Sequence, residues 1–133
     1  MRRSRLIYLA LFCVLLPAAS ASAAQMRRPY DGLWASSAKK CMDREGVDRM
    51  HVEGDRFTWY ETRCRAFDVK PVDARSWTMR MSCEGEGDKF RVRPRLLLPN
   101  PNRLVFADQP PVGQTKREVY VRCDEKRAPR SDR

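Results

Sequence analysis

The chain has 133 residues, of which 42% are hydrophobic and 33% charged, and its formal net charge is +10 at pH 7. This length allows one small domain and excludes a multidomain protein. The basic charge favours partners with anionic surfaces, such as anionic lipid, lipopolysaccharide or acidic glycans, although solubility alone also accounts for it.

The first 24 residues have the three parts of a secretory signal peptide. Met1–Arg5 is basic, Leu6–Leu16 is apolar, and small residues fill positions 18–24. The apolar run is too short to span a bilayer, which requires about twenty residues. We therefore predict cleavage after Ala23 or Ala24, a periplasmic or secreted protein, and no transmembrane segment after cleavage.

Four cysteines remain after the predicted cleavage: Cys41, Cys64, Cys83 and Cys123. An even number of cysteines in a short exported chain indicates disulfides. Three connectivities are compatible with the sequence, and we predict Cys41–Cys64 and Cys83–Cys123. No two cysteines have C-x-x-C spacing and the only histidine is His51, so no metal or cofactor is predicted.

The elements expected along the chain are a short helical turn followed by strands. Ser36–Met42 suits the turn, because either serine can cap it. From Asp48 onward apolar and polar residues alternate with a period of two, and turn residues separate the runs. The expected strands cover 49–53, 57–64, 65–72, 76–83, 89–98, 103–107 and 116–123. This pattern predicts an all-β fold, a small antiparallel meander of six to eight strands closed as a barrel or folded as a sandwich. We expect a single β domain over residues 25–123 and a flexible charged tail over 124–133.

The segment Phe57–Cys64 is expected to be the central strand, with Phe57, Trp59 and Glu61 on one face. A carboxylate among aromatic side chains needs a partner, so Glu61 is a candidate buried acid. Arg63 shares the face of Glu61 two residues along the strand, and Arg80 or Arg122 could lie beside Glu61 on neighbouring strands. Two interpretations stay open for Glu61. It is either a structural residue, paired with an arginine or solvated, or an acid that contacts a ligand.

A row of cations is the candidate anion-binding site. Lys89, Arg91, Arg93 and Arg95 alternate along one predicted strand and would form a stripe of about 20 Å. The alternative is edge protection, because exposed cations on an edge strand prevent aggregation.

Two resemblances to known families accompany these patterns. Gly32-Leu33-Trp34 is similar to the G-x-W opening of lipocalin-like barrels, in which an arginine of a late strand packs over the tryptophan, a role that would fall to Arg122. The mature chain also resembles a class of small exported proteobacterial proteins of unknown function, and this resemblance implies no activity. It depends on Trp34, Cys41, Glu61-Thr-Arg-Cys64, Cys83 and Tyr120-Val-Arg-Cys123.

No motif for an enzyme or for nucleic-acid binding is present, since the chain lacks a G-x-S-x-G elbow and any RNP-like or helix-turn-helix pattern. We expect an exported non-catalytic binding module for an anionic envelope component or an envelope protein. The alternatives are a lipocalin-like carrier of a small apolar ligand, and a periplasmic inhibitor of a cell-wall enzyme that acts through the loop Asp108–Thr115.

Overall fold

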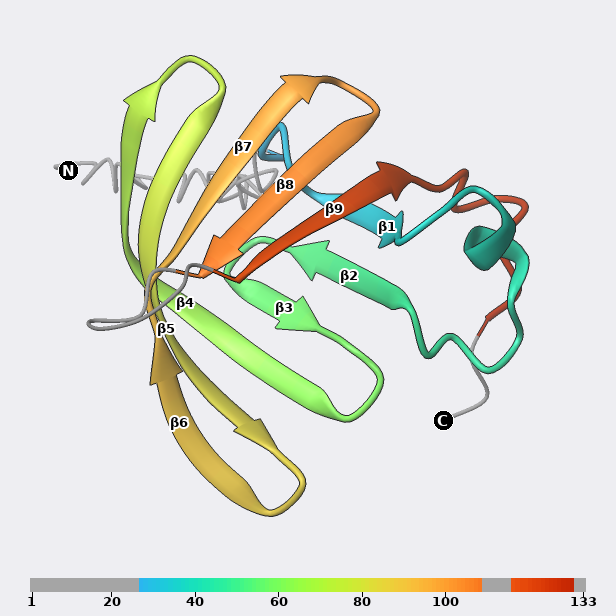
Figure 1. Cartoon of the computed structure of the whole chain (residues 1–133), viewed down its shortest axis with the longest axis horizontal. Helices are drawn as coiled ribbons and strands as arrows, with labels where there is room; N and C mark the ends of the chain where they lie inside the picture. Colours follow the sequence, from blue (N-terminus) through green and yellow to red (C-terminus); the bar gives the residue numbers. More distant parts are fainter. Residues whose placement is uncertain (1–26, 109–115, 131–133) are drawn as a thin grey trace, which may run out of the picture.

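The computed structural model describes residues 27–108 and 116–130. The predicted signal peptide, the loop residues 109–115 and the last three residues lie outside this part of the chain. Nine strands and one 3-10 turn occur within it (Figure 1). They are β1 (Gly32–Ala35), η1 (Lys39–Met42), β2 (Arg49–Glu53), β3 (Arg56–Thr58), β4 (Thr62–Asp73), β5 (Ser76–Gly85), β6 (Asp88–Val92), β7 (Pro94–Asn100), β8 (Arg103–Asp108) and β9 (Arg117–Arg122).

Eight of these strands close into an antiparallel barrel, which confirms the predicted fold class and decides between barrel and sandwich. The order around the barrel is β1, β2, β3, β4, β5, β7, β8 and β9, and β9 pairs with β1 to close it. β6 is the exception, because it pairs only with β5 among the described strands. Figure 1 shows the β5–β6 hairpin projecting away from the barrel, at the lower left of the view.

Alternation along each strand separates the core from the surface. In β5, Met79, Met81 and Cys83 are buried, whereas Arg80 and Ser82 are exposed. The interior is filled by large side chains, among them Tyr30, Trp34, Met50, Val52, Phe57, Met81, Leu96 and Leu104. The expected contact between Arg122 and the early tryptophan is present, with the Arg122 guanidinium carbon 4.1 Å from the centre of the Trp34 ring. No helix of the described residues has the length and apolar character to cross a membrane.

All four cysteines form disulfides, but the predicted connectivity is wrong. The bonds are Cys41–Cys123 and Cys64–Cys83. Cys64 and Cys83 are direct partners in the β4–β5 ladder. Barrel closure brings the end of β9 beside β1, where Cys123 N donates a hydrogen bond of 2.8 Å to the carbonyl of Leu33. Cys41 on η1 lies close enough to this end of β9 to bond to Cys123. The prediction failed because the sequence did not show which strands become neighbours, and both bonds join residues that the strand pairing of the closed barrel brings together.

The segment Phe57–Cys64 is not one strand, and Glu61 is not a buried acid. The chain reverses between β3 and β4, where Trp59 N donates a hydrogen bond of 2.8 Å to the carbonyl of Thr62. Glu61 lies in this turn and is exposed. It forms no ion pair with a cation of the described residues, so the expected Glu61–arginine pair is absent there. The turn has no glycine, proline, asparagine or aspartate, the residues that usually mark a hairpin.

Candidate anion-binding face

The predicted row of cations is divided between two strands. Lys89 and Arg91 are exposed on β6, Arg93 lies between β6 and β7, and Arg95 is half-buried on β7. β6 pairs with β5 residues 81–85, whereas β7 pairs with β5 residues 76–78. Both strands nevertheless pair with β5 in one antiparallel register, and the ladder is interrupted only at Arg93 and Pro94, which has no N–H to donate. The four cations therefore keep one phase and lie on the outer side of the sheet, while Pro94 and Leu96 between and beyond them are buried.

Pairing across strands brings further cations beside this row. Residues in register share a face of the sheet. One row of partners runs through His51, Thr58, Arg63, Glu84 and Lys89, and the neighbouring row runs through Glu53, Arg56, Arg65, Ser82 and Arg91. We call the surface formed by Arg56, Arg63, Arg65, Lys89 and Arg91 the basic face. It covers the outer side of β3, β4, β5 and β6.

Most cations of the basic face lack an internal counter-ion. Arg65 Nε lies 3.1 Å from a carboxylate oxygen of Asp55. The remaining four, Arg56, Arg63, Lys89 and Arg91, are exposed and form no ion pair with a carboxylate in residues 27–108 or 116–130. Glu84 is the acidic residue inside the first row, between Arg63 and Lys89. The face therefore offers four cations without an ion pair in the described chain, with Glu84 between two of them and Glu53 opposite Arg56.

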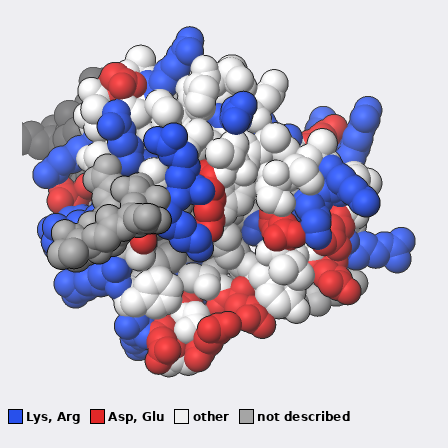
Figure 2. Space-filling view, viewed as in Figure 1, with Lys and Arg blue, Asp and Glu red and all other residues white. Residues whose placement is uncertain are grey.

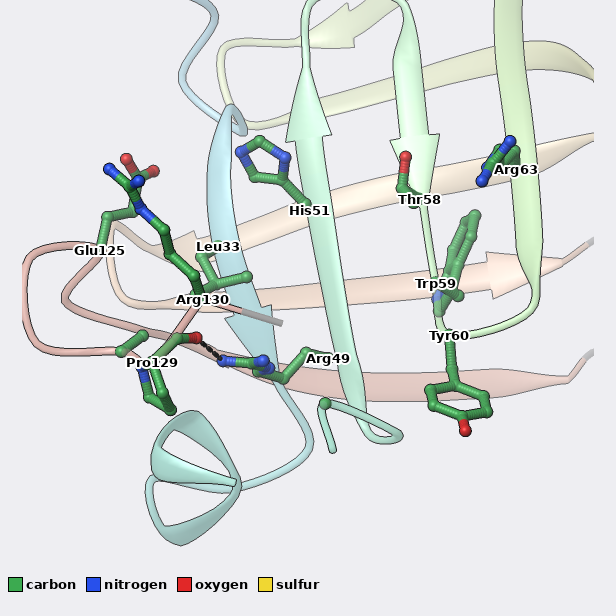
Figure 3. A pocket seen from close by; sticks show the side chains of 12 residues that line it. Leu33, Arg49, His51, Thr58, Trp59, Tyr60, Arg63, Glu125, Pro129 and Arg130 are labelled. Carbon is green, nitrogen blue, oxygen red and sulfur yellow. Dashed lines mark hydrogen bonds between the residues drawn. The ribbon is translucent and has the colours of Figure 1, made fainter. Parts of the chain in front are cut away.

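Two depressions hollow this region, and they share Thr58 and Arg63. The smaller, of about 360 Å³, is lined by Arg56, Arg65 and Lys89 of the basic face. The larger, of about 530 Å³, lies between the outer side of β1–β4 and the segment after β9. In Figure 3, His51, Thr58 and Arg63 extend from neighbouring strands, while Glu125, Pro129 and Arg130 form the other wall.

Arg49 holds the far wall of the larger depression in place. It is only 6% exposed, and its Nη1 donates a hydrogen bond of 2.9 Å to the carbonyl of Pro129, drawn as a dashed line in Figure 3. Gly46 makes room for this guanidinium, since a Cβ at Gly46 would lie 2.7 Å from Arg49 Nη2. A buried arginine on β2 thus fixes part of the segment that we predicted to be a flexible tail.

A third depression, of about 390 Å³, lies at the mouth of the barrel and is lined by apolar side chains together with four charged ones. We call it the apolar hollow and define it by its apolar side chains Val47, Trp59, Tyr60, Phe90, Val92 and Phe106. Phe90 is 43% exposed, because the β5–β6 hairpin extends beyond the barrel. Glu61 lines this hollow, so the candidate acid borders a surface site instead of the core.

Hydrogen bonds in series connect the apolar hollow to β9. Trp59 Nε1 donates to the hydroxyl of Tyr120 at 3.2 Å, and that hydroxyl donates to a Glu118 carboxylate oxygen at 2.5 Å. Lys116 Nζ lies 2.8 Å from the other oxygen. Burial, together with the bond to Glu118, raises the pKa of Tyr120 well above its usual value. The phenol therefore stays protonated and remains a donor at neutral pH.

The sequence could not identify the arginines of β3 and β4 as part of the site. Arg56, Arg63 and Arg65 face outward in the alternation, but only the strand register places them beside Lys89 and Arg91. Figure 2 shows lysine and arginine side chains spread over the visible face, with one group of acidic side chains at the lower edge, near the β5–β6 hairpin, and others among the cations. Charge content alone therefore gives no position for a site.

Within the described residues, no three histidine, cysteine, aspartate or glutamate side chains come together as a metal site. In comparisons with known proteins, the chain matches no family model, no curated protein and no solved structure.

Proposed function

We propose that the protein is an exported, non-catalytic binding module whose basic face binds an anionic component of the cell envelope. One observation carries the proposal. Arg56, Arg63, Lys89 and Arg91 are exposed on one face without a carboxylate partner among the described residues. Elsewhere some cations, such as Lys40 and Lys116, lie close to carboxylates of the described residues, and others, such as Arg103, do not, so the basic face is set apart by the grouping of its cations.

The chemistry of the face suits phosphate or carboxylate groups. Arginine presents a planar fork of donors that matches both groups, and Thr58 and Ser82 place hydroxyl donors in the same rows. Residues two apart on a strand are about 7 Å apart, and strands separated by one neighbour are about 10 Å apart. Arg63, Arg65, Lys89 and Arg91 therefore stand at the corners of a rectangle that fits several anionic groups at once.

Two observations support export. Both disulfides lie within the described fold, and such bonds form and persist in oxidising compartments. The predicted signal peptide would direct the chain there. The anionic lipids and lipopolysaccharide that we expect as partners are components of that environment.

Binding to vesicles tests the proposal. We expect the mature protein to bind phosphatidylglycerol vesicles and lipopolysaccharide, to release both at high salt, and to ignore phosphatidylcholine vesicles. The double variant Arg63→Gln with Lys89→Gln should bind about thirtyfold more weakly, since each cation near an anionic surface contributes about 1 kcal/mol.

A matched control separates the face from net charge. Arg103→Gln with Arg117→Gln removes the same two charges from β8 and β9, on the other side of the barrel. This control should bind nearly as well as the parent protein. An equal loss in both double variants would refute the basic face as the binding site.

The geometry gives the other candidate functions no comparable support. A carrier needs an internal cavity, but side chains such as Trp34, Phe57 and Met81 occupy the barrel interior. The loop assigned to an inhibitor lies outside the described residues except for Asp108.

A further inference from the structure

The free edge of β6 is a feature that the proposed function does not use. Among the described strands β6 pairs only with β5, and four of its five residues are exposed. No backbone hydrogen bond joins its other side to residues 27–108 or 116–130. An edge with unpaired N–H and C=O groups is a template for an additional strand.

The turn of the hairpin determines which residues present their backbone to this edge. Glu86 and Gly87 form a two-residue turn with φ angles of 52° and 85°. In such type I′ hairpins the flanking residues, here Gly85 and Asp88, form a hydrogen-bonded pair. Bonded and non-bonded pairs alternate along an antiparallel ladder. Residues 89 and 91 therefore direct their N–H and C=O groups away from β5.

The β4–β5 ladder supports this assignment of the outward-facing residues of β6. Cys64 and Cys83 are paired with a Cα separation of 4.0 Å, and short separations are typical of non-hydrogen-bonded pairs. Cys83 thus directs its backbone groups away from β4 and toward Phe90, its partner on β6. Because Phe90 bonds to β5, its neighbours Lys89 and Arg91 must bond outward.

The two sides of β6 differ in chemistry. Lys89 and Arg91 belong to the basic face, whereas Phe90 lies on the opposite side and lines the apolar hollow. A strand added at the edge shares these faces with its partners. Acidic residues would lie opposite Lys89 and Arg91, and an apolar residue would lie opposite Phe90 and extend the hollow.

We infer that the free edge of β6 binds an extended segment of a partner protein, in which acidic and apolar residues alternate, by β-strand addition. A second copy of the chain is a poor occupant. Antiparallel pairing of two β6 strands about Phe90 would place Lys89 of one copy opposite Arg91 of the other, and like charges directly opposite are destabilising. The inference needs backbone pairing and does not rest on the proposed binding of anionic envelope components.

Two variants at one position test the backbone requirement. The probe is a fluorescein-labelled Ser-Glu-Val-Glu-Val-Glu-Ser peptide, and fluorescence anisotropy measures its affinity for the mature, disulfide-bonded protein. Arg91→Gln and Arg91→Pro both remove the cation, but only proline removes the outward N–H. Proline is tolerated at such an edge position, since the bonds to β5 stay intact.

We expect Arg91→Gln to weaken peptide binding about threefold, as for a lost cross-strand charge pair. Arg91→Pro should weaken it by about a further tenfold, because a bonding partner on the peptide is left unpaired. Equal affinities of the two variants, with circular dichroism matching the parent protein, would overturn the inference.

A modified peptide tests the same point on the unaltered protein. The peptide methylated on the backbone nitrogens that face β6 should lose measurable binding, and retention of the full affinity would also overturn the inference. Phosphatidylglycerol vesicles distinguish the two proposals. Vesicle binding should fall equally in Arg91→Gln and Arg91→Pro, because both variants lose the same charge. If the parent protein binds vesicles but not the peptide, strand addition is refuted and the proposed binding of anionic envelope components is not.

Discussion

Arg122 at the end of β9 donates a hydrogen bond of 2.7 Å to the carbonyl oxygen of Asp31, just before β1. The same guanidinium donates to the carbonyls of Pro29 at 2.8 Å and Pro101 at 2.7 Å, while its face covers Trp34. One side chain thus joins the segment before β1, the β7–β8 turn and the tryptophan at this end of the barrel.

Replacing Arg122 should therefore cost more than replacing an ordinary surface arginine. Arg122→Met keeps an apolar stem over Trp34 but leaves three carbonyls without their donor, and we expect a loss of about 2–4 kcal/mol in the free energy of unfolding. Arg122→Lys should recover only part of it, since an ammonium cannot span three acceptors in one plane. Urea unfolding measures both. Arg117→Met on the same strand is the control and should cost less than about 0.5 kcal/mol. Equal losses at the two positions would contradict this role of Arg122.

The two disulfides should contribute unequally to stability. Cys41–Cys123 closes a loop with a sequence separation of 82, against 19 for Cys64–Cys83. Loop-closure entropy then predicts about 4.5 kcal/mol for the first bond and about 3 kcal/mol for the second. Variants in which both cysteines of one bond are replaced by alanine, compared by urea unfolding, show which bond contributes more to the free energy of unfolding. A larger loss from removing the short-loop bond would show that native packing, not chain entropy, decides.

Glu118 should make stability depend on acid pH. Partial burial opposes its ionisation, but hydrogen bonds from Lys116 and Tyr120 outweigh this and hold the pKa of Glu118 below its usual 4.5. A carboxyl whose pKa is lower in the folded state stabilises the fold above the unfolded pKa, and this stabilisation is lost as pH falls through the folded pKa. The difference in Tm between the parent protein and Glu118→Gln should therefore narrow between about pH 6 and pH 3. A difference in Tm that stays constant over this pH range would refute this role of Glu118. Asp73, whose pKa is also lowered, by hydrogen bonds from Arg75 and Ser76, is present in both proteins.

Glu84 should weaken the binding of anions at the basic face. Its carboxylate lies in the row between Arg63 and Lys89, where it offsets part of their charge. Glu84→Gln should bind phosphatidylglycerol vesicles about fivefold more tightly, from about 1 kcal/mol per unit of charge. Asp108→Asn on β8 removes an equal charge from another part of the barrel and should change binding much less. An equal gain from both variants would indicate a response to net charge alone.

Glu61→Gln should leave the fold almost unchanged. The side chain is exposed and has no ion-pair partner in the described chain, so we expect a change below about 0.5 kcal/mol in the free energy of unfolding. Thermal unfolding followed by circular dichroism is sufficient. A loss of several degrees in Tm would restore the structural role that the sequence suggested.

Local patterns were enough to predict the strands, because alternation reports burial directly. Met79, Met81 and Cys83 on β5 show this most clearly. The pairing of distant strands was not predictable in the same way. The Cys41–Cys123 bond depends on β9 becoming the neighbour of β1 when the sheet closes, and no local signal encodes that closure.

The error at Phe57–Cys64 has a local cause. In this segment apolar and polar residues continue to alternate across the turn between β3 and β4. Trp59 and Phe90 are large and apolar, which favours the core in any local scheme, but both line the apolar hollow at the mouth of the barrel. Their positions follow from the length of the β5–β6 hairpin relative to the barrel, a property that only the assembled sheet has.

The positions of the disulfides along the chain set the order in which they can form. Cys64 and Cys83 belong to one hairpin and can be joined as soon as that hairpin has been synthesised, whereas Cys41 has to wait until Cys123, after the last strand, is available. Until then the thiol of Cys41 has no native partner. An early hairpin bond and a late bond at the seam of the barrel would thus mark two successive stages of maturation, and the late bond records that the whole sheet has closed.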